Sequence, residues 1–227
     1  SVWKAAKLGF KMLPMIITST LAKGAVVMSR RKVIVKRLDA IQNFGAMNIL
    51  CTDKTGTLTQ DKICLERHTD IMGHDFDDVL EYAYLNSYYQ TGLKNLLDVA
   101  VLERGNFGDI PLLVKKYSKI DEVPFDFQRR RMSVVVADES GDNVLICKGA
   151  VEEMMRACTY AEHNNQVMPL SEELLEKLRL VTAELNADGL RVVAVAKKAY
   201  PRSKTVYAVS DEQEMILVGY VAFLDPP

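Results

Sequence analysis

The segment with the clearest chemical potential is Asn48–Gln60, in which a short apolar run leads directly into the heptad Asp-Lys-Thr-Gly-Thr-Leu-Thr. The apolar run, Ile49–Cys51, is short enough to be a buried strand. A carboxylate at the carboxyl end of a parallel strand lies where α/β sheets bind ligands, and it can act as a nucleophile that forms an aspartyl phosphate. An Asp that only caps an ordinary strand–turn is the alternative. The unbroken heptad favours Asp53 as a nucleophile.

The residues after Asp53 suit a phosphate. Lys54 offers a point charge, and the backbone N–H groups of Thr55–Thr57 can surround phosphate oxygens. Gly56 lets the chain approach the phosphate closely, because it has no side chain. This short segment therefore predicts a site for phosphoryl transfer.

The heptad resembles the phosphorylation signature of the P-type ATPases, which pump ions through an aspartyl-phosphate intermediate. The resemblance implies that Asp53 is the catalytic nucleophile, that Lys54 and Thr55 belong to the same catalytic site, and that Asp53 and Thr55 hold Mg²⁺. Related haloacid-dehalogenase (HAD) phosphatases carry a second Asp two residues after the nucleophile, where this chain has Thr55. Because a Thr activates water poorly at neutral pH, we expect a long-lived phosphoenzyme.

Composition indicates an ordinary globular chain. Its 227 residues are 48% apolar and 26% charged, which fits one or two domains. The net charge of −1 gives no electrostatic case for binding nucleic acid. The four cysteines form no Cys-x-x-Cys pair, and two of them lie in strand-like apolar runs, so we expect reduced, buried thiols in a cytosolic setting.

Residues 1–38 combine an apolar run with a basic stretch. Leu8–Ala22 is apolar with few breaks, and six basic residues follow it: Lys23, Arg30, Arg31, Lys32, Lys36 and Arg37. No stretch reaches the ~20 apolar residues of a full membrane span. An apolar half-span followed by positive charge is still typical of a helix that leaves a membrane on its cytosolic side. An amphipathic core helix is the alternative.

Residues 12–38 also resemble the helix and stalk that precede the phosphorylation strand in bacterial magnesium-transporting P-type ATPases. The resemblance implies the cytosolic portion of a bacterial inner-membrane protein, whose ion path runs through a membrane domain outside this chain. Phe10 and Lys11 depart from the family, which tends to carry Pro-Glu before Met-Leu-Pro. We expect a further strand at Val33–Val35 and a short helix at Leu38–Phe44.

After Gln60, most of the chain alternates in the manner of an antiparallel sheet with attached helices. The expected strands are Lys62–Glu66, Met132–Ala137, Val144–Cys147, Arg191–Ala196 and Ile216–Leu224, and the expected helices are Asp75–Leu85, Leu96–Glu103, Ala150–Ala157 and Ser171–Ala187. Ser171 caps the last helix and Gly189 ends it. The three histidines show no metal-ligand spacing and are interpreted as surface residues.

Three pieces of this region could hold a nucleotide. The first places Phe125 beside the basic run Arg129–Arg131, where a ring can stack on a purine near its phosphates. The second is Cys147–Ala150, a strand end with a cation and two small residues. The third is Gly189–Arg191, a cation that opens a strand. Each piece alone is equally an ordinary basic hairpin or turn.

In this order after the heptad, the three pieces resemble the nucleotide-binding domain of P-type ATPases. The resemblance implies that Phe125 stacks on adenine and that Arg130 and Arg191 meet the phosphates. It also implies that Lys148 and Gly149 line the pocket. Asp98 matches the acidic residue near the adenine amine.

The expected fold is α+β. An antiparallel-sheet nucleotide-binding domain with helices, residues 61–214, is inserted in an incomplete Rossmann-like (HAD-type) phosphorylation domain. That second domain begins at residues 39–60, and its return strand and hinge are residues 215–227, stiffened by Pro226 and Pro227. The family's later Thr-Gly-Asp and Gly-Asp-Gly-x-x-Asn-Asp segments are not in this chain.

The expected function is part of an ATP-driven cation transporter, with Mg²⁺ as the ion. Two alternatives stay open. One is a nucleotide-binding module without turnover, which would describe an isolated fragment. The other is a soluble phosphatase of the HAD superfamily, against which Thr55 and the nucleotide pocket argue.

Overall fold

The computed structural model describes residues 2–52, 62–106, 110, 114–138 and 142–224. The chain divides into two compact units, residues 1–52 and 53–227.

The first unit consists of the long helix α1 (Val2–Arg30) and the short helix α2 (Ala40–Phe44). Helix α1 continues through Pro14, whose carbonyl accepts a hydrogen bond from Thr18 Oγ1 at 2.8 Å. Within it, Met12–Arg30 has a mean hydropathy of 1.4 and is long and apolar enough to cross a membrane, by length and composition. This segment contains Lys23 and Arg30, so it passes by its average hydropathy and not as an unbroken run of ~20 apolar residues.

Two expected strands of this unit do not form. Val33–Val35 and Ile49–Cys51 are irregular, with Ile34, Ile49 and Leu50 between 73% and 87% exposed. A strand needs a neighbour that pairs with its backbone groups, and the described residues supply none to either segment. Cys51 is exposed for the same reason, whereas Cys147 and Cys158 are buried as expected. Helix α2 confirms the short helix expected before Asn48.

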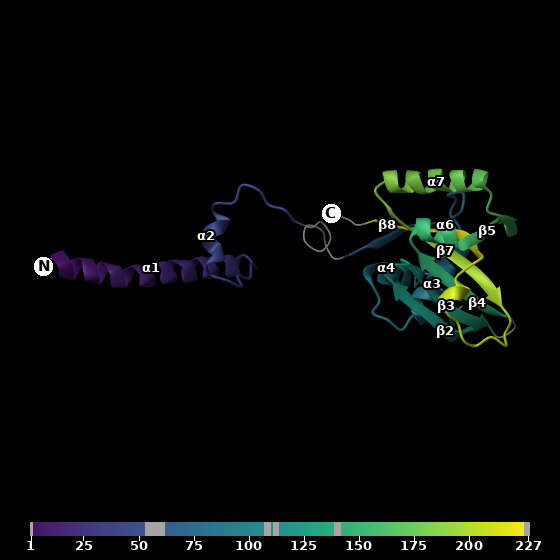
Figure 1. Cartoon of the computed structure of the whole chain (residues 1–227), viewed down its shortest axis with the longest axis horizontal. Coiled ribbons are helices and arrows are strands. Elements are labelled where there is room, and N and C mark those ends of the chain that lie inside the picture. The colour runs from purple at the N-terminus through teal and green to yellow at the C-terminus, as the bar shows by residue number, and fades with distance from the viewer. Residues whose placement is uncertain (1, 53–61, 107–109, 111–113, 139–141, 225–227) are drawn as a thin grey trace. The chain divides into compact units, whose positions relative to one another are not determined.

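The second unit is a layered α+β arrangement of a sheet and helices (Figure 1). Its described elements are β1 (Cys64–Asp70), α3 (Asp77–Tyr89), α4 (Leu96–Gly105), β2 (Tyr117–Asp126), β3 (Arg131–Asp138), β4 (Asn143–Gly149), α6 (Val151–Ala157), β5 (Cys158–His163), β6 (Gln166–Pro169), α7 (Glu172–Ala187), β7 (Arg191–Tyr200), a 3-10 turn (Val209–Asp211) and β8 (Met215–Leu224).

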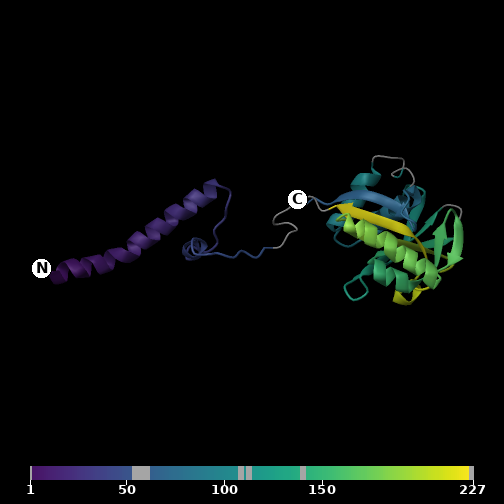
Figure 2. The ribbon, with the colours of Figure 1, turned by 90° about the horizontal axis from the view of Figure 1, so that it is seen from above.

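The strands form one mixed sheet in the order β2-β3-β4-β7-β8-β5-β6, and β1 pairs with β8 off this path. All pairs are antiparallel except β5–β8. The α+β class is confirmed. Strand β8 runs between β7 and β1 inside this sheet, as Figure 2 shows in yellow and blue. Residues 215–224 therefore belong to the sheet, which differs from the expected return strand of a neighbouring domain.

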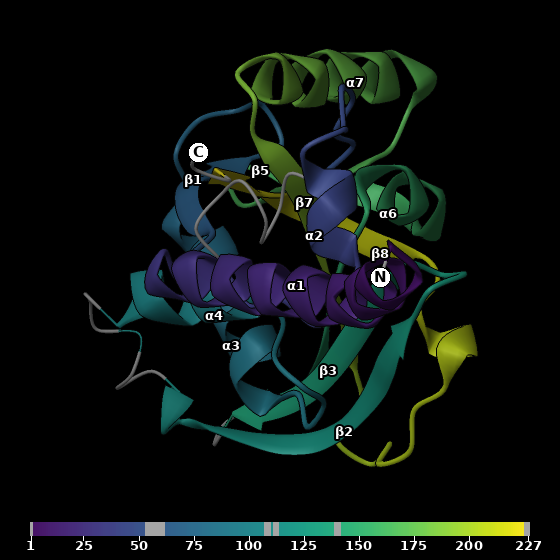
Figure 3. The same cartoon turned by 90° about the vertical axis from the view of Figure 1, so that its left-hand side faces the viewer.

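Helices cover both faces of the sheet. One core joins α3 and α4 to side chains such as Val134, Val136 and Ile146, and the other joins α6 and α7 to Val135 and Leu145. Successive residues of β3 thus face opposite cores, as the period of a strand requires. Figure 3 shows α3 and α4 together, apart from α6 and α7. Because both faces are covered, β8 is apolar almost throughout rather than alternating.

The strands missed from the sequence are β2, β5 and β6. Strand β2 lies at an edge and carries charges and Pro124, which native edge strands use against further pairing. It therefore does not alternate cleanly. Strands β5 and β6 form a tight hairpin turned by Asn164 and Asn165, both with positive φ. This Asn-Asn pair is the signal that could have located the hairpin.

Replacing Gly219 by Ala should destabilise the sheet domain. A Cβ at Gly219 would lie 2.0 Å from the Thr69 carbonyl oxygen and 2.7 Å from Val79 Cγ2, so β1 or α3 must shift. We expect a loss of about 1–3 kcal/mol in unfolding free energy, measured by urea unfolding followed by circular dichroism. Gly92→Ala is the control, because nothing lies within 4 Å of its added Cβ. Equal stability of the two variants would contradict the close approach of β1 and β8.

Candidate functional site

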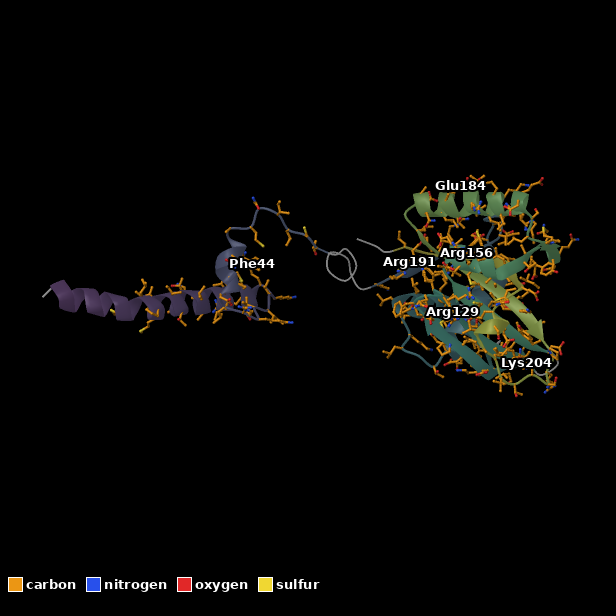
Figure 4. All side chains as sticks on the ribbon, in the orientation of Figure 1. Phe44, Arg129, Arg156, Glu184, Arg191 and Lys204 are labelled. Atoms are coloured by element: carbon orange, nitrogen blue, oxygen red, sulfur yellow. The ribbon has the colours of Figure 1, made fainter. Side chains whose placement is uncertain are left out.

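The residues expected to bind a nucleotide converge on one end of the sheet. Phe125 lies at the end of β2 and Gly149 at the end of β4. The register pairs Asp126 with Arg131 and Arg131 with Gly149, which brings the three strand ends side by side. Arg191 begins the adjacent strand β7 (Figure 4).

Phe125 is carried on an exposed hairpin between β2 and β3. Its side chain is 50% exposed, and its ring meets that of Phe127 edge-on at 5.3 Å between centroids. Asp126 forms the turn, because its Oδ1 accepts hydrogen bonds from the backbone N–H groups of Gln128 (2.6 Å) and Arg129 (3.2 Å). The hairpin therefore presents an aromatic face to solvent.

Arg130 and Arg191 supply exposed positive charge at this end. Arg130 has a φ of 49°, and its backbone is tied to the neighbouring strand because its carbonyl accepts from Ala150 N at 3.0 Å. Arg191 lies four residues before Val195, which pairs with Lys148. Alternation along β7 puts Arg191 on the same face as Lys148, about 13 Å further along the strand.

Lys148 is buried against α3 and α4 rather than open to solvent. Its Nζ donates to Asp98 Oδ1 at 2.5 Å and to Ser87 Oγ at 2.7 Å, and Ser87 Oγ donates to the same Asp98 oxygen at 3.0 Å. The exposed fractions are 8% for Lys148, 1% for Asp98 and 0% for Ser87. The three side chains join the end of β4 to both helices of that face.

Asp98 is oriented by the start of its own helix. Asn95 caps α4 by accepting from Asp98 N at 3.0 Å, and Asp98 Oδ2 accepts from Asn95 N at 3.1 Å, which completes a capping box. Both carboxylate oxygens of Asp98 are thus engaged within the protein. The structure places this residue as the partner of Lys148, a role that the sequence analysis did not foresee.

Each member of the pair shifts the pKa of the other. Burial raises the pKa of Asp98, but the Lys148 ammonium and hydrogen bonds from Lys148, Gln90 and Asn95 outweigh it, so the pKa of Asp98 lies below its ordinary value. Burial lowers the pKa of Lys148, and Asp98 opposes that shift. Removing either partner would leave a buried charge without compensation.

Gly149 is required by the protein backbone itself. A Cβ on this residue would lie 2.4 Å from Arg131 Cβ and 2.9 Å from the Arg130 carbonyl oxygen. The glycine therefore permits β3 and β4 to approach at the point where the hairpin begins. The sequence analysis gave it a place against the ligand, and the structure shows its packing role.

The expected catalytic residues Asp53, Lys54 and Thr55 lie outside the described residues. The same holds for the expected Mg²⁺ ligands, which are Asp53 and Thr55. Within the described part of the chain, no group of three or more His, Cys, Asp or Glu residues could hold a metal ion.

Sequence reasoning missed Ser87, Asn95 and Glu212 at this end of the sheet. Asn95 had a signal, because Asn-x-x-Asp before an apolar run is a capping-box pattern. Ser87 and Glu212 contact residues 61 and 79 to 83 positions away, respectively. No local pattern encodes such contacts.

Comparison with known proteins places the chain in one family. The family described as P-type ATPase, cytoplasmic domain N, matches residues 48–227. The Magnesium-transporting ATPase, P-type 1, of Escherichia coli is 59% identical over 217 residues, which are 96% of this chain and 24% of that protein. The protein of the same name from Salmonella typhimurium is 60% identical over the same shares.

A more distant relative is a calcium-transporting ATPase of Listeria monocytogenes, 29% identical over 95% of this chain and 27% of that protein. The chain thus spans about a quarter of the length of the curated relatives it matches.

Asp98→Asn should destabilise the sheet domain at pH 7, because it leaves the Lys148 ammonium buried without its counter-charge. We expect a loss of about 3–5 kcal/mol in unfolding free energy, measured by urea unfolding. Glu176→Gln is the matched surface control. Its carboxylate pairs with Arg179 while both side chains are over 60% exposed, so we expect a change below about 0.5 kcal/mol.

The difference between the native chain and Asp98→Asn should also depend on pH. The pKa of Asp98 is lower in the folded than in the unfolded state, so its ionised form stabilises the fold above the unfolded pKa, about 4. That contribution is lost as the pH falls through the lowered pKa. A difference in stability that stays constant between pH 7 and pH 3 would contradict the ion pair.

Proposed function

The chain belongs to the P-type ATPase family, and on that premise we propose that its sheet domain binds ATP at the end of the sheet where Phe125, Lys148 and Arg191 converge. The observation that carries the proposal is this convergence. An exposed aromatic ring and two exposed guanidinium groups come from strand ends at the same end of the sheet as β4, which carries the buried Lys148 ammonium. A purine with a chain of phosphates has the complementary chemistry.

Each residue takes a distinct part in the proposed site. The Phe125 ring stacks on adenine, since this residue is half exposed and every purine has a π-face. Lys148 lies at the floor, where two of its three N–H donors are held by Asp98 and Ser87 and the third is left for the ligand. Arg130 and Arg191 meet the phosphates, because an exposed guanidinium binds phosphate in a bidentate manner.

Asp98 acts in this proposal by holding Lys148. The expected contact between Asp98 and the adenine amine would compete with existing hydrogen bonds, because Asp98 is 1% exposed and both of its oxygens already accept hydrogen bonds from the protein. Gly149 likewise contributes by bringing β3 and β4 together beside the ligand.

We extend the proposal to the whole protein. It transports Mg²⁺ at the expense of ATP, as the names of its relatives from Escherichia coli and Salmonella typhimurium state for those proteins. ATP would phosphorylate Asp53, with Lys54, Thr55 and Mg²⁺ neutralising the charge of the transferred group. The sheet domain is an insertion in a HAD-type phosphorylation domain, and helix α1 is the end of a span of the bacterial inner membrane.

The two alternative functions differ from this one in whether the protein becomes phosphorylated and how fast it loses the phosphate. A nucleotide-binding module without turnover would bind ATP and never become phosphorylated. A HAD-type phosphatase would hydrolyse its phosphoenzyme rapidly, which Thr55 disfavours because it is a poor general base. Acid-stable labelling by ATP that carries ³²P in its γ-phosphate separates the three functions.

Phe125→Ala should weaken ATP binding to the 227-residue chain. Loss of one stacked ring costs about 1–3 kcal/mol, or roughly 5- to 150-fold in affinity. Isothermal titration measures the dissociation constant. Tyr160→Ala on β5 is the control, because this ring is also exposed (41%) but lies on the far side of β8 from β7. If both variants bind ATP as the native chain does, adenine is not held by Phe125.

Asp53→Asn in the full-length transporter should abolish acid-stable ³²P labelling and leave ATP binding unchanged. The amide cannot attack the γ-phosphate, whereas the proposed nucleotide site lies in the sheet domain. Asp39→Asn is the control, since Asp39 is exposed and pairs with Arg37 at 2.7 Å. A variant that still labels would exclude Asp53 as the nucleophile.

A further inference from the structure

A second buried carboxylate lies on the opposite face of the sheet from Asp98. Glu212 follows the 3-10 turn Val209–Asp211 and is 0% exposed. Its Oε2 accepts from Arg129 Nη1 and from Arg131 Nε (2.9 Å), and its Oε1 accepts from Ser133 Oγ at 2.7 Å. Ser133 pairs with Cys147 in the core that contains α6 and α7. Charged groups are buried this deeply only when they are paired and hydrogen-bonded, as here.

Arg129 connects this carboxylate to the hairpin that carries Phe125. While its Nη1 donates to Glu212, its Nη2 donates to the Pro124 carbonyl oxygen at 2.7 Å. That carbonyl belongs to the peptide bond immediately before Phe125. The planar guanidinium thus forms a rigid link from the buried carboxylate to the backbone of the aromatic residue.

The other contacts of the hairpin tip are local, within residues 125–130. Residues 124–128 are exposed, and the β2–β3 register shifts between Val123 and Asp126. Exposed hairpin tips open at low free-energy cost unless they are tied down. The link through Arg129 is therefore well placed to set the position of the Phe125 ring.

We propose that Glu212 is a positioning residue for nucleotide binding, which holds the backbone of Phe125 through Arg129 without touching the nucleotide. This inference rests on the proposed function. Its physical basis is pre-organisation: a hairpin that is already ordered loses less conformational freedom when the purine stacks. A purely structural Glu212 would stabilise the fold and leave the stacking interaction unaffected.

A double-mutant cycle separates these two roles. In the 227-residue chain, Glu212→Gln should weaken ATP binding about 3- to 10-fold. In a Phe125→Ala background, the same change should alter affinity less than about 2-fold, because the ring that Glu212 positions is gone. An equal loss in both backgrounds, or no loss in either, would overturn the proposal.

The control for burial is Glu162→Gln. Glu162 is also buried and pairs with Lys197 at 2.6 Å, and Lys197 donates to Tyr82 rather than to the hairpin. Its removal should leave ATP affinity within about 2-fold of the native value. A loss as large as that of Glu212→Gln would mean that any buried carboxylate has the same effect, which would overturn the positioning role.

Hydrogen exchange tests the link without ATP. Glu212→Gln should accelerate exchange of the Arg130 amide, which donates to the Asp126 carbonyl at 2.7 Å, and leave the β7–β8 ladder unchanged. Unchanged exchange in the hairpin would overturn the link.

If Glu212→Gln does not fold, Arg129→Lys serves instead, because it keeps the charge and loses the planar link. Native protein that does not bind ATP would overturn the proposed function, while exchange still decides whether Glu212 holds the hairpin.

Discussion

The ion pair between Lys148 and Asp98 is the interaction on which the candidate site depends most. It joins the end of β4 to α4, and Ser87 adds α3 to the same junction. Such a pair contributes less through its own attraction than through the cost of breaking it, because either charge left alone would be buried without compensation. The position of β4 relative to the two helices is therefore specified at the point where a nucleotide would bind.

The second charged cluster acts on the same end of the sheet from the other face. Glu212 accepts hydrogen bonds from Arg129, Arg131 and Ser133, while Lys148 donates to Asp98 and Ser87. Between the two clusters lies the close contact of β3 and β4 that Gly149 allows. Charges held on both faces restrict the strand ends in a way that apolar packing alone does not, since hydrogen bonds are directional and dispersion contacts are not.

The rest of the sheet serves to hold these strand ends. Strand β8 pairs with β7, β1 and β5, and its side chains fill both cores. The described chain enters the sheet at Cys64 and leaves it at Leu224, which face each other in the β1–β8 register. An inserted domain needs this arrangement, because both of its ends must return to the same place in the parent chain. The geometry is thus compatible with the insertion that we propose.

The sequence by itself determined the class of the fold and most of its elements. Alternation and short apolar runs located β3, β4, β7 and β8, and a Ser cap with acidic residues in the first turn located α7, because these signals are local. The heptad at Asp53 and the short segments around Phe125, Lys148 and Arg191 could also be recognised from the sequence, since the residue types in each suggest a function. Edge strand β2 could not be recognised, because its charges and Pro124 interrupt the alternation.

Only the tertiary structure decided how those pieces cooperate. The partner of Lys148 is 50 residues away, and the carboxylate behind Arg129 is 83 residues away. Asp98 is interpreted from sequence as a ligand contact and from structure as a counter-charge, because burial and register determine which groups remain free for a ligand. Ile49–Cys51 is a case in which the sequence predicted too much. An apolar run predicts a strand, but it becomes one only when a neighbouring strand pairs with it, and this segment is irregular.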